Sequence, residues 1–284
     1  MPLKSVTGVD HVVVAVRDLD AAAAVWASLG FSMSPRGLHS AHLGTGNYTT
    51  MFQDDYLELL GIVNPTDQNT PTRDFLKERE GIERTAFTAI DAEKGAEELR
   101  SRGLEPLGPV NFGRPVPLPG GGETEARFSV FRWPLVEKPG GMRIFACQHH
   151  TRPAVWIPEI MRHANGATRI VRIEILSADP KASAAHMSRL IDQPITHAPD
   201  GAPVVASGGT RADFVFLDQT ALAGRYPAQA LAGVPTGGAV SLVLGTSDLA
   251  GATKALGARG VAHHGGVSVA AKDATGVIVS FVPN

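Results

Sequence analysis

A recurring interval between an aspartate and a glycine constrains the fold of this 284-residue chain most strongly. In VDHVVVAVRDLDAAAAVWASLG a β-rich run leads into Asp18 and Asp20, and Gly30 stands twelve residues after Asp18. Such an aspartate accepts hydrogen bonds from the first turn of a helix, and glycine suits the left-handed position after its end. The interval recurs in TAFTAIDAEKGAEELRSRG and SLVLGTSDLAGATKALGARG, whereas a fourth copy, RIVRIEILSADPKASAAHMSRLI, has isoleucine at the glycine position. Each copy therefore predicts a strand followed by a helix.

Short β-like segments follow each copy. They read FSMSPRG, SAHLGTG, YTTMF and YLELLGI after the first, ARFSVFRW and MRIFACQ after the second, PVVASG and ADFVFLD after the third, and GVSVAA and GVIVSFV after the last. One strand, one helix and about three strands, repeated four times, predict an α+β fold built from four βαβββ units.

The βαβββ order, occurring in pairs, resembles the vicinal oxygen chelate superfamily of glyoxalases, bleomycin-resistance proteins and extradiol dioxygenases. The segments DHVVVAVRDLDAA, YLELLGI and CQHHTRPAVW are similar to its glyoxalase-like branch. The resemblance implies that two units pair into one curved sheet around a cavity. We therefore expect a glyoxalase-like domain with the active site over residues 5–150, a linker over 151–165 and a second, degenerate domain over 166–284.

The resemblance also implies that metal ligands come from the first and last strands of a unit, here His11 and Glu58. Imidazole and carboxylate suit a divalent cation such as zinc, iron, nickel or manganese. Strand alternation places His11 on one face with Val9 and Val13, and Glu58 on one face with Tyr56 and Leu60. A carboxylate in an apolar strand is costly to bury without a metal, a cation or water. The alternative is a hydrogen-bonded core histidine, with Glu58 paired to Arg84 across the sheet.

The equivalent positions of the other units do not carry metal ligands. The first-strand position holds Arg84, Arg172 and Ser241 in units two to four, and the last-strand position holds Phe145 in unit two and Ser280 in unit four. Half of the four-ligand set that the resemblance implies is therefore missing.

His149 is the candidate to complete a set with His11 and Glu58. It shares a strand face with Phe145, whereas its neighbour His150 points to the other face if the strand continues. A two-histidine, one-carboxylate set would suit non-haem iron and dioxygen. His39 and His42 are further candidates at the rim of the cavity.

Four residues are assigned to the substrate. A guanidinium in a cavity clamps a carboxylate or phosphate, so Arg84 predicts a small anion such as a keto or hydroxy acid, unless it is only a structural or surface arginine. Asn47 and Tyr48 can hydrogen-bond a ligand oxygen, although a turn asparagine is the alternative, and Phe145 is placed at the same surface.

Two other features predict structure rather than chemistry. The glycines of PLPGGGETEARF, at 120–122, lead into a strand and not a helix, which favours a hairpin loop or lid over a phosphate cradle. Cys147 shares a face with His149, but no orienting group or oxyanion site accompanies them, so a buried thiol is expected.

Composition limits the partners. The net charge is −2, with no basic face for nucleic acid, and no apolar run approaches the ~20 residues of a membrane span. One cysteine and no apolar stretch behind MPLKSVTG fit a cytoplasmic protein without a secretory signal. A small-molecule substrate is the expected partner, and a homodimer is possible.

The leading hypothesis is a divalent-metal-dependent enzyme of the lyase, isomerase or dioxygenase type. It would act on a small, oxygen-rich substrate, with an anion as one option, and would use the metal as Lewis acid and Glu58 as the group that moves a proton. The alternative is a metal-free protein of the same fold that binds or sequesters a small molecule. In either case the second half is expected to be structural.

Overall fold

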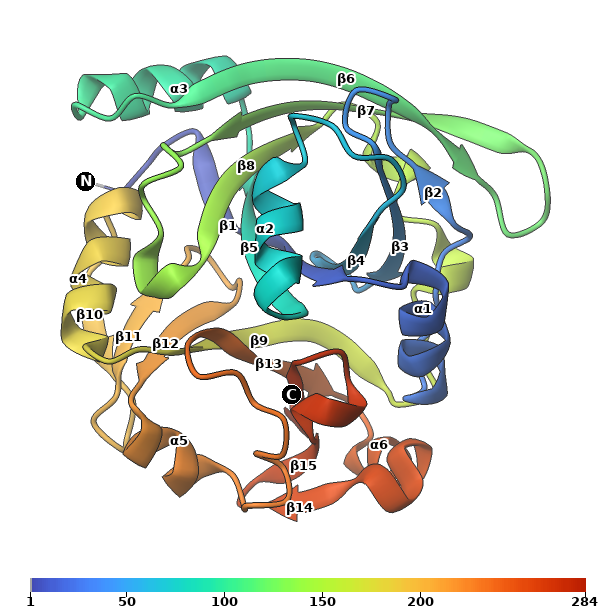
Figure 1. Ribbon diagram of the computed structural model, residues 1–284, viewed down its shortest axis with the longest axis vertical. Helices are drawn as coiled ribbons and strands as arrows, with labels where there is room; N and C mark the ends of the chain where they lie inside the picture. Colours follow the sequence, from blue (N-terminus) through green and yellow to red (C-terminus); the bar gives the residue numbers. More distant parts are fainter. Residues whose placement is uncertain (1) are drawn as a thin grey trace.

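The computed structural model describes residues 2–284 and contains two eight-stranded sheets made of four βαβββ units (Figure 1). The first unit comprises β1 (Val6–Val16), α1 (Leu19–Ser28), β2 (Gly37–Leu38), β3 (Thr45–Met51) and β4 (Tyr56–Ile62). The helix α2 (Thr70–Glu78) leads to the second unit, β5 (Gly81–Ala89), α3 (Ala92–Ser101), β6 (Leu107–Pro117), β7 (Glu123–Arg132) and β8 (Arg143–His149).

The second sheet repeats this plan. The third unit comprises β9 (Ala167–Leu176), α4 (Pro180–Ile191), β10 (Ile195–His197), β11 (Pro203–Ala206) and β12 (Asp213–Leu217). The helix α5 (Gln219–Arg225) leads to β13 (Gly238–Thr246), α6 (Leu249–Leu256), β14 (Val261–His263), β15 (Gly266–Val269) and β16 (Ile278–Pro283).

Strand pairing confirms the predicted α+β fold of four units in two glyoxalase-like pairs. The order is β2-β3-β4-β1-β5-β8-β7-β6 in the first sheet and β10-β11-β12-β9-β13-β16-β15-β14 in the second. The first and last strands of a unit run parallel, as β1 and β4 do, whereas the first strands of paired units, β1 and β5, run antiparallel. The two units of each sheet are thereby related by an approximate twofold axis.

The aspartates of the repeat cap the helices as predicted. The side chain of each accepts a hydrogen bond from the N–H three residues later, as Asp18 does from Ala21 at 3.0 Å; the others are Asp91, Asp179 and Asp248. Asp20 lies inside α1 and is not the cap.

The glycines of the repeat follow the prediction in two of three units. Gly30 and Gly103 have φ of 91° and 75°, the left-handed region that glycine adopts without steric cost. The prediction is wrong for Gly260, whose φ is −72°, because α6 ends earlier and Gly257 takes the positive φ of 56°.

Two helices, α2 and α5, were not predicted, and FSMSPRG is not a strand before Gly37. α2 lies inside the curve of the first sheet, whereas α1 and α3 lie outside it (Figure 1). Among the helices of residues 2–284, none has the length and apolar character needed to cross a membrane.

One apolar core joins the two sheets. The rings of Phe87 and Phe214 lie 5.7 Å apart and link the two sheets, and the ring of Phe31, in the loop after α1, lies 5.9 Å from that of Phe281 on β16. Residues 151–165, which connect β8 to β9 along the chain, form short turns. Trp156 in this segment packs against Tyr56, with the two rings 5.4 Å apart. The exact limits of the domains and linker stay a prediction.

Asp55 is a buried carboxylate between the halves, and its ionisation is expected to cost stability. Burial raises its pKa to about 7, although the N–H of Ile170 at 3.1 Å and the charge of Arg211 act in the opposite direction. Because the folded pKa exceeds the unfolded value near 4, the contribution of Asp55 to stability is fully present below pH 4 and is lost as pH rises through 7. A shift of this size corresponds to roughly 4 kcal/mol above pH 7.

Asp55→Asn keeps an acceptor for Ile170 but cannot ionise. We expect it to be a few kcal/mol more stable than wild type at pH 8 and about equal to it at pH 4. Urea unfolding at both pH values measures the difference, and a stability gap that does not change with pH contradicts the assignment.

Candidate functional site

A β-bulge in β1 turns two adjacent residues to the same side of the sheet. Val9 pairs with Phe87 and His11 with Ala86, so Asp10 has no partner of its own on β5. A bulge adds one residue to a strand and interrupts the alternation of side chains. Asp10 and His11 therefore both face the concave side, while Val9 joins the core on the other face. The predicted common face of His11 and Val9 is wrong for this reason.

Asp10 fixes the orientation of two imidazoles. Its Oδ1 lies 2.7 Å from His11 Nδ1 and 2.9 Å from His149 Nε2, and its Oδ2 accepts from the hydroxyl of Thr88 at 2.9 Å. Burial alone would raise the pKa of Asp10, but the attraction of His149 and the hydrogen bonds from both rings hold it well below its usual value. A carboxylate on one ring nitrogen fixes the tautomer and leaves the other nitrogen of His11, Nε2, for the cavity.

Glu58 on β4 lies next to that free nitrogen. Its Oε2 lies 3.9 Å from His11 Nε2, and its Oε1 lies 3.6 Å from His39 Nε2 and accepts a hydrogen bond from the Asn47 amide at 2.7 Å. His39 is held in turn by the Thr45 hydroxyl, 2.8 Å from its Nδ1. The structure thus brings His11, Glu58 and Asn47 together as predicted, and His39 with them.

Glu58 is ionised at neutral pH. Burial raises its pKa, but the nearby His39, His11 and Arg84 and the Asn47 hydrogen bond outweigh this and lower the pKa below its usual range. His39 itself is neutral at pH 7, because burial lowers its pKa to about 4. The charge that holds Glu58 ionised at pH 7 therefore comes from the other groups and not from His39.

The donor set on the cavity wall fits a divalent metal held by His11 and Glu58. Bonds of about 2.1 Å from one ion to a nitrogen and to an oxygen allow these atoms to lie up to about 4.2 Å apart, so the 3.9 Å separation is compatible. A second imidazole on the cavity wall, His39, has its Nε2 3.6 Å from Glu58 Oε1. Arg84 and Phe145 occupy the remaining positions of the family pattern.

A second cluster, Asp10, His11 and His149, also has ligand atoms within 4.8 Å of one another. Its short contacts are those of hydrogen bonds, and of its three members only His11 lines the cavity. His149 Nδ1 is buried without a hydrogen-bond partner among the described residues. We interpret Asp10 and His149 as groups that support His11, so the predicted ligand His149 is not brought to the cavity surface.

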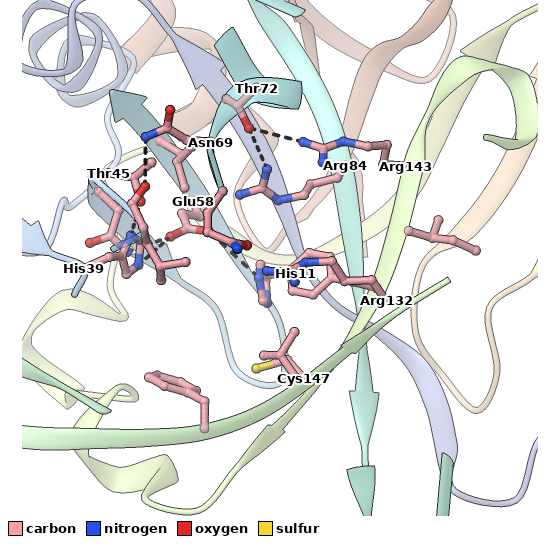
Figure 2. A pocket seen from close by; sticks show the side chains of 18 of the residues that line it. His11, His39, Thr45, Glu58, Asn69, Thr72, Arg84, Arg132, Arg143 and Cys147 are labelled. Carbon is pink, nitrogen blue, oxygen red and sulfur yellow. Dashed lines mark hydrogen bonds and ion pairs between the residues drawn. The ribbon is translucent and has the colours of Figure 1, made fainter. Parts of the chain in front are cut away.

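The cavity has a volume of about 140 Å³ and lies in the hollow of the first sheet, closed on one side by α2 (Figure 2). Its apolar wall includes Tyr56, stacked 4.3 Å from His11, and Phe145, 5.4 Å from it. Polar groups from α2 and the loop before it, Thr72 and Asn69, face the same space. This wall excludes water from one side of the pair formed by His11 and Glu58.

Arg84 lines the cavity but is not the direct partner of Glu58. Its guanidinium donates to Glu83 at 2.6 Å and to the Thr72 hydroxyl at 3.1 Å. The structure therefore does not contain the ion pair between Glu58 and Arg84 that was the alternative to a metal. Phe145 lies below this guanidinium, 5.7 Å from it.

Tyr48 is not brought to the cavity. Its hydroxyl donates to Asp20 at 2.8 Å, on the outer face of β3, because it is adjacent to the inward-facing Asn47 and alternation turns it outward. The assignment of Tyr48 to substrate binding is thus contradicted by the geometry. His42 likewise lies on an exposed turn outside the cavity.

Cys147 lines the cavity as a thiol with a pKa raised well above its usual value by burial. Its sulfur lies 3.7 Å from His149 Nε2, the atom that already contacts Asp10. This agrees with the expectation of an unreactive thiol. The glycines at 120–122 form the exposed turn between β6 and β7, the predicted hairpin.

Among residues 2–284, no equivalent centre is found in the second sheet. Its one buried inward carboxylate, Glu174, is held by Arg172 and Arg225 at 2.8 Å each and by the Tyr226 hydroxyl at 2.6 Å. Tyr226 and its neighbours after α5 fill the space with apolar groups. The described part of this half therefore supports the prediction that it is structural.

Gly37 leaves room for two cavity residues. A Cβ at this position would overlap the amide oxygen of Asn47 and lie 3.0 Å from a nitrogen of Arg114.

We expect Gly37→Ala to weaken ligand binding about tenfold, because Asn47 would move away from Glu58. We also expect it to destabilise the fold by about 1–3 kcal/mol. Thermal unfolding and titration with an anionic ligand measure both effects. Gly120→Ala, where a Cβ meets no atom within 4 Å, is the control, and equal behaviour of the two variants contradicts the prediction.

Sequence reasoning missed Asp10, Arg114 and Arg132, which the structure brings to or behind the cavity. A carboxylate within a valine-rich strand was the available signal for Asp10. No sequence signal separates Arg114 and Arg132 from other arginines of a strand.

Comparison with known proteins places this geometry in context. The family described as "Glyoxalase-like domain" matches residues 9–191, more than half of the chain. A hypothetical protein from Staphylococcus aureus has a similar structure, with a TM-score of 0.69 and 13% identity over 97% of this chain and 99% of that one. A mutant of 4-hydroxymandelate synthase from Streptomyces coelicolor gives a TM-score of 0.55 and 15% identity over 90% of this chain and 75% of that one. At these identities the likeness shows the fold alone. No significant match was found among curated proteins.

Proposed function

The chain belongs to the glyoxalase-like domain family, and we propose that it is a metal-dependent enzyme acting on a small anionic, oxygen-rich molecule in the cavity of its first sheet. The observation that carries this proposal is the buried Glu58 carboxylate, 3.9 Å from His11 Nε2, in a cavity that arginines also line. The reaction class that fits is an isomerase- or lyase-type proton transfer next to a carbonyl. Oxygenation is less well supported, because His149 does not join the set.

His11 and Glu58 would hold the metal, and His39 lies beside Glu58 on the same wall of the cavity. When bound, a divalent metal supplies Lewis-acid polarisation of a substrate oxygen. Of the named metals, zinc, iron, nickel and manganese all suit imidazole and carboxylate donors. The donor set alone does not choose among them.

The remaining chemistry belongs to this chain's own residues. Glu58, ionised at neutral pH, would accept and return the proton of the substrate carbon through Oε2, the oxygen that Asn47 does not hold, once that oxygen has left the metal. Asn47 holds the other oxygen, which keeps the carboxylate in one position. Arg84 binds an anionic group of the substrate, while Tyr56 and Phe145 keep water away from the reacting atoms.

Metal analysis tests the proposal. Protein purified without chelator is expected to contain close to one divalent ion per chain, and His11→Ala and Glu58→Ala to lose it. His42→Ala, on an exposed turn, is the matched control and keeps the ion. Wild-type protein that binds no zinc, nickel, manganese or ferrous ion on titration contradicts the proposal.

A metal-free binding protein is the second candidate. This candidate is favoured because two positions that the resemblance assigns to metal ligands hold Arg84 and Phe145 instead. A binding protein of this kind would bind an anion tightly without metal and would not turn it over.

A homodimer also stays a prediction, testable by light scattering.

A further inference from the structure

The cavity carries more positive than negative charge. Four arginines line it: Arg84, Arg114, Arg132 and Arg143. Two of them share one carboxylate, since Arg84 and Arg143 both donate to Glu83. Glu137, also on the cavity wall, is already held by His186 and Arg189. Glu58 is the one remaining cavity carboxylate within the described residues.

Arg114 is buried without a protein partner for its charge. It is 8% exposed, and within the described chain its side chain has no hydrogen bond or ion pair to another residue. Its guanidinium contacts only a ring face, with its carbon 6.0 Å from the centre of Phe128. Its charge contributes to lowering the pKa of His39, so it lies near the Glu58 end of the cavity.

Arg132 is a second cation without a carboxylate or hydrogen-bond partner among residues 2–284. It pairs with Phe145 across β7 and β8, and its side chain points into the cavity (Figure 2). Burial and the charges of Arg84 and Arg143 lower its pKa to about 10, so it is still cationic at neutral pH. Arg84, Arg143 and Arg132 therefore bring three positive charges to this part of the cavity, and Glu83 pairs with the first two of them.

The two unpaired arginines enter the cavity at different places. Arg114 pairs with Ala126 on β7, and Arg132 is six residues further along that strand, so the two side chains reach the same cavity from different positions on the sheet. A buried guanidinium without a counter-charge is strongly unfavourable unless a ligand supplies the charge. Two such groups at separate points require a ligand with negative charge at both ends.

We infer that the substrate is a small dianion, with one anionic group bound by Arg114 near Glu58 and the other by Arg132 beside Arg84 and Arg143. The inference rests on the proposal that this cavity holds the substrate. Either a carboxylate or a phosphate can supply each group, because both accept the paired hydrogen bonds of a guanidinium. Arg114 and Arg132 would then determine specificity, by rejecting a molecule that has only one charge.

Titration calorimetry with three probes tests this inference. Succinate has two carboxylates, phosphoglycolate has a phosphate and a carboxylate, and succinamate has the length of succinate but a single charge. We expect one of the two multiply charged probes to bind at least 100-fold tighter than succinamate, and the tighter of the two identifies carboxylate or phosphate as the second group. Arg132→Met should reduce that ratio to below tenfold, and Arg114→Met should weaken the tighter probe at least tenfold.

Arg127→Met is the matched control, because Arg127 is on β7 but on its exposed face. It is expected to keep the wild-type affinities. Thermal unfolding without ligand checks the fold, and Arg114→Met and Arg132→Met should melt no lower than wild type, since each removes a cavity charge that has no protein partner. A drop of several degrees would show that these cations have protein partners and would overturn the inference.

Equal affinity for succinate and succinamate, no binding of any probe, or an unchanged ratio in Arg132→Met would also overturn it. Metal content separates this failure from failure of the proposed function. Wild-type protein that holds metal but does not prefer the dianions contradicts the inference alone. Protein that prefers the dianions without binding any metal contradicts the proposed enzyme and leaves the inference intact.

Discussion

Replacing Glu58 with glutamine is expected to lower the rate of substrate proton exchange by about 10²–10⁴-fold. Glutamine keeps the size of the side chain and an oxygen that accepts from Asn47, but it cannot take up a proton. The fold should therefore persist while the chemistry is lost. The rate is measured by proton NMR as the exchange of carbon-bound hydrogen for deuterium in D₂O, with 2-oxoglutarate as the first probe.

Glu123→Gln is the control for this comparison, since Glu123 is exposed at the start of β7. It should exchange at the wild-type rate. If Glu58→Gln also exchanges at the wild-type rate, with metal bound, Glu58 is not the proton-transfer group and the mechanism above is wrong.

Asp10→Ala is expected to have the second large effect, on both stability and metal affinity. Removing this carboxylate leaves the ring nitrogens of His11 and His149 without their shared partner in a buried position. Breaking a buried pair of this kind costs about 3–5 kcal/mol, and loss of a carboxylate behind a metal-binding histidine weakens metal binding about 10–100-fold. Chemical unfolding and metal titration measure the two effects.

Asp10→Asn distinguishes loss of orientation from loss of fold. It keeps an acceptor oxygen, so it should recover most of the stability but only part of the metal affinity. Asp20→Ala, which removes an exposed carboxylate of α1, is the control and should change little. Wild-type metal affinity in both Asp10 variants would show that Asp10 does not orient His11.

The repeat predicted the fold because each copy contains its own start and stop signals. Asp18 and Gly30 act within a few residues, through hydrogen bonds of one helix turn and one backbone conformation. Such local effects are readable from a single sequence. The helix α2 has no capping side chain, and α5 is capped by Asp218 but has no glycine twelve residues later, so both helices were missed.

The site was predictable where strand alternation holds and not where it breaks. Alternation correctly placed Glu58 with Tyr56 on the cavity face, but the bulge at Asp10 depends on pairing with β5, a contact between distant parts of the chain. The same holds for Arg132, whose lack of a partner appears only when its neighbours in space are known. Tyr48 failed for a local reason, since it alternates with Asn47 and so faces outward.

The most direct test of a metal held by His11 and Glu58 is anomalous diffraction from crystals soaked with manganese or zinc. The account predicts one strong peak within about 2.3 Å of both His11 Nε2 and Glu58 Oε2. A peak among Asp10, His11 Nδ1 and His149, or no peak in the first sheet at all, would contradict it.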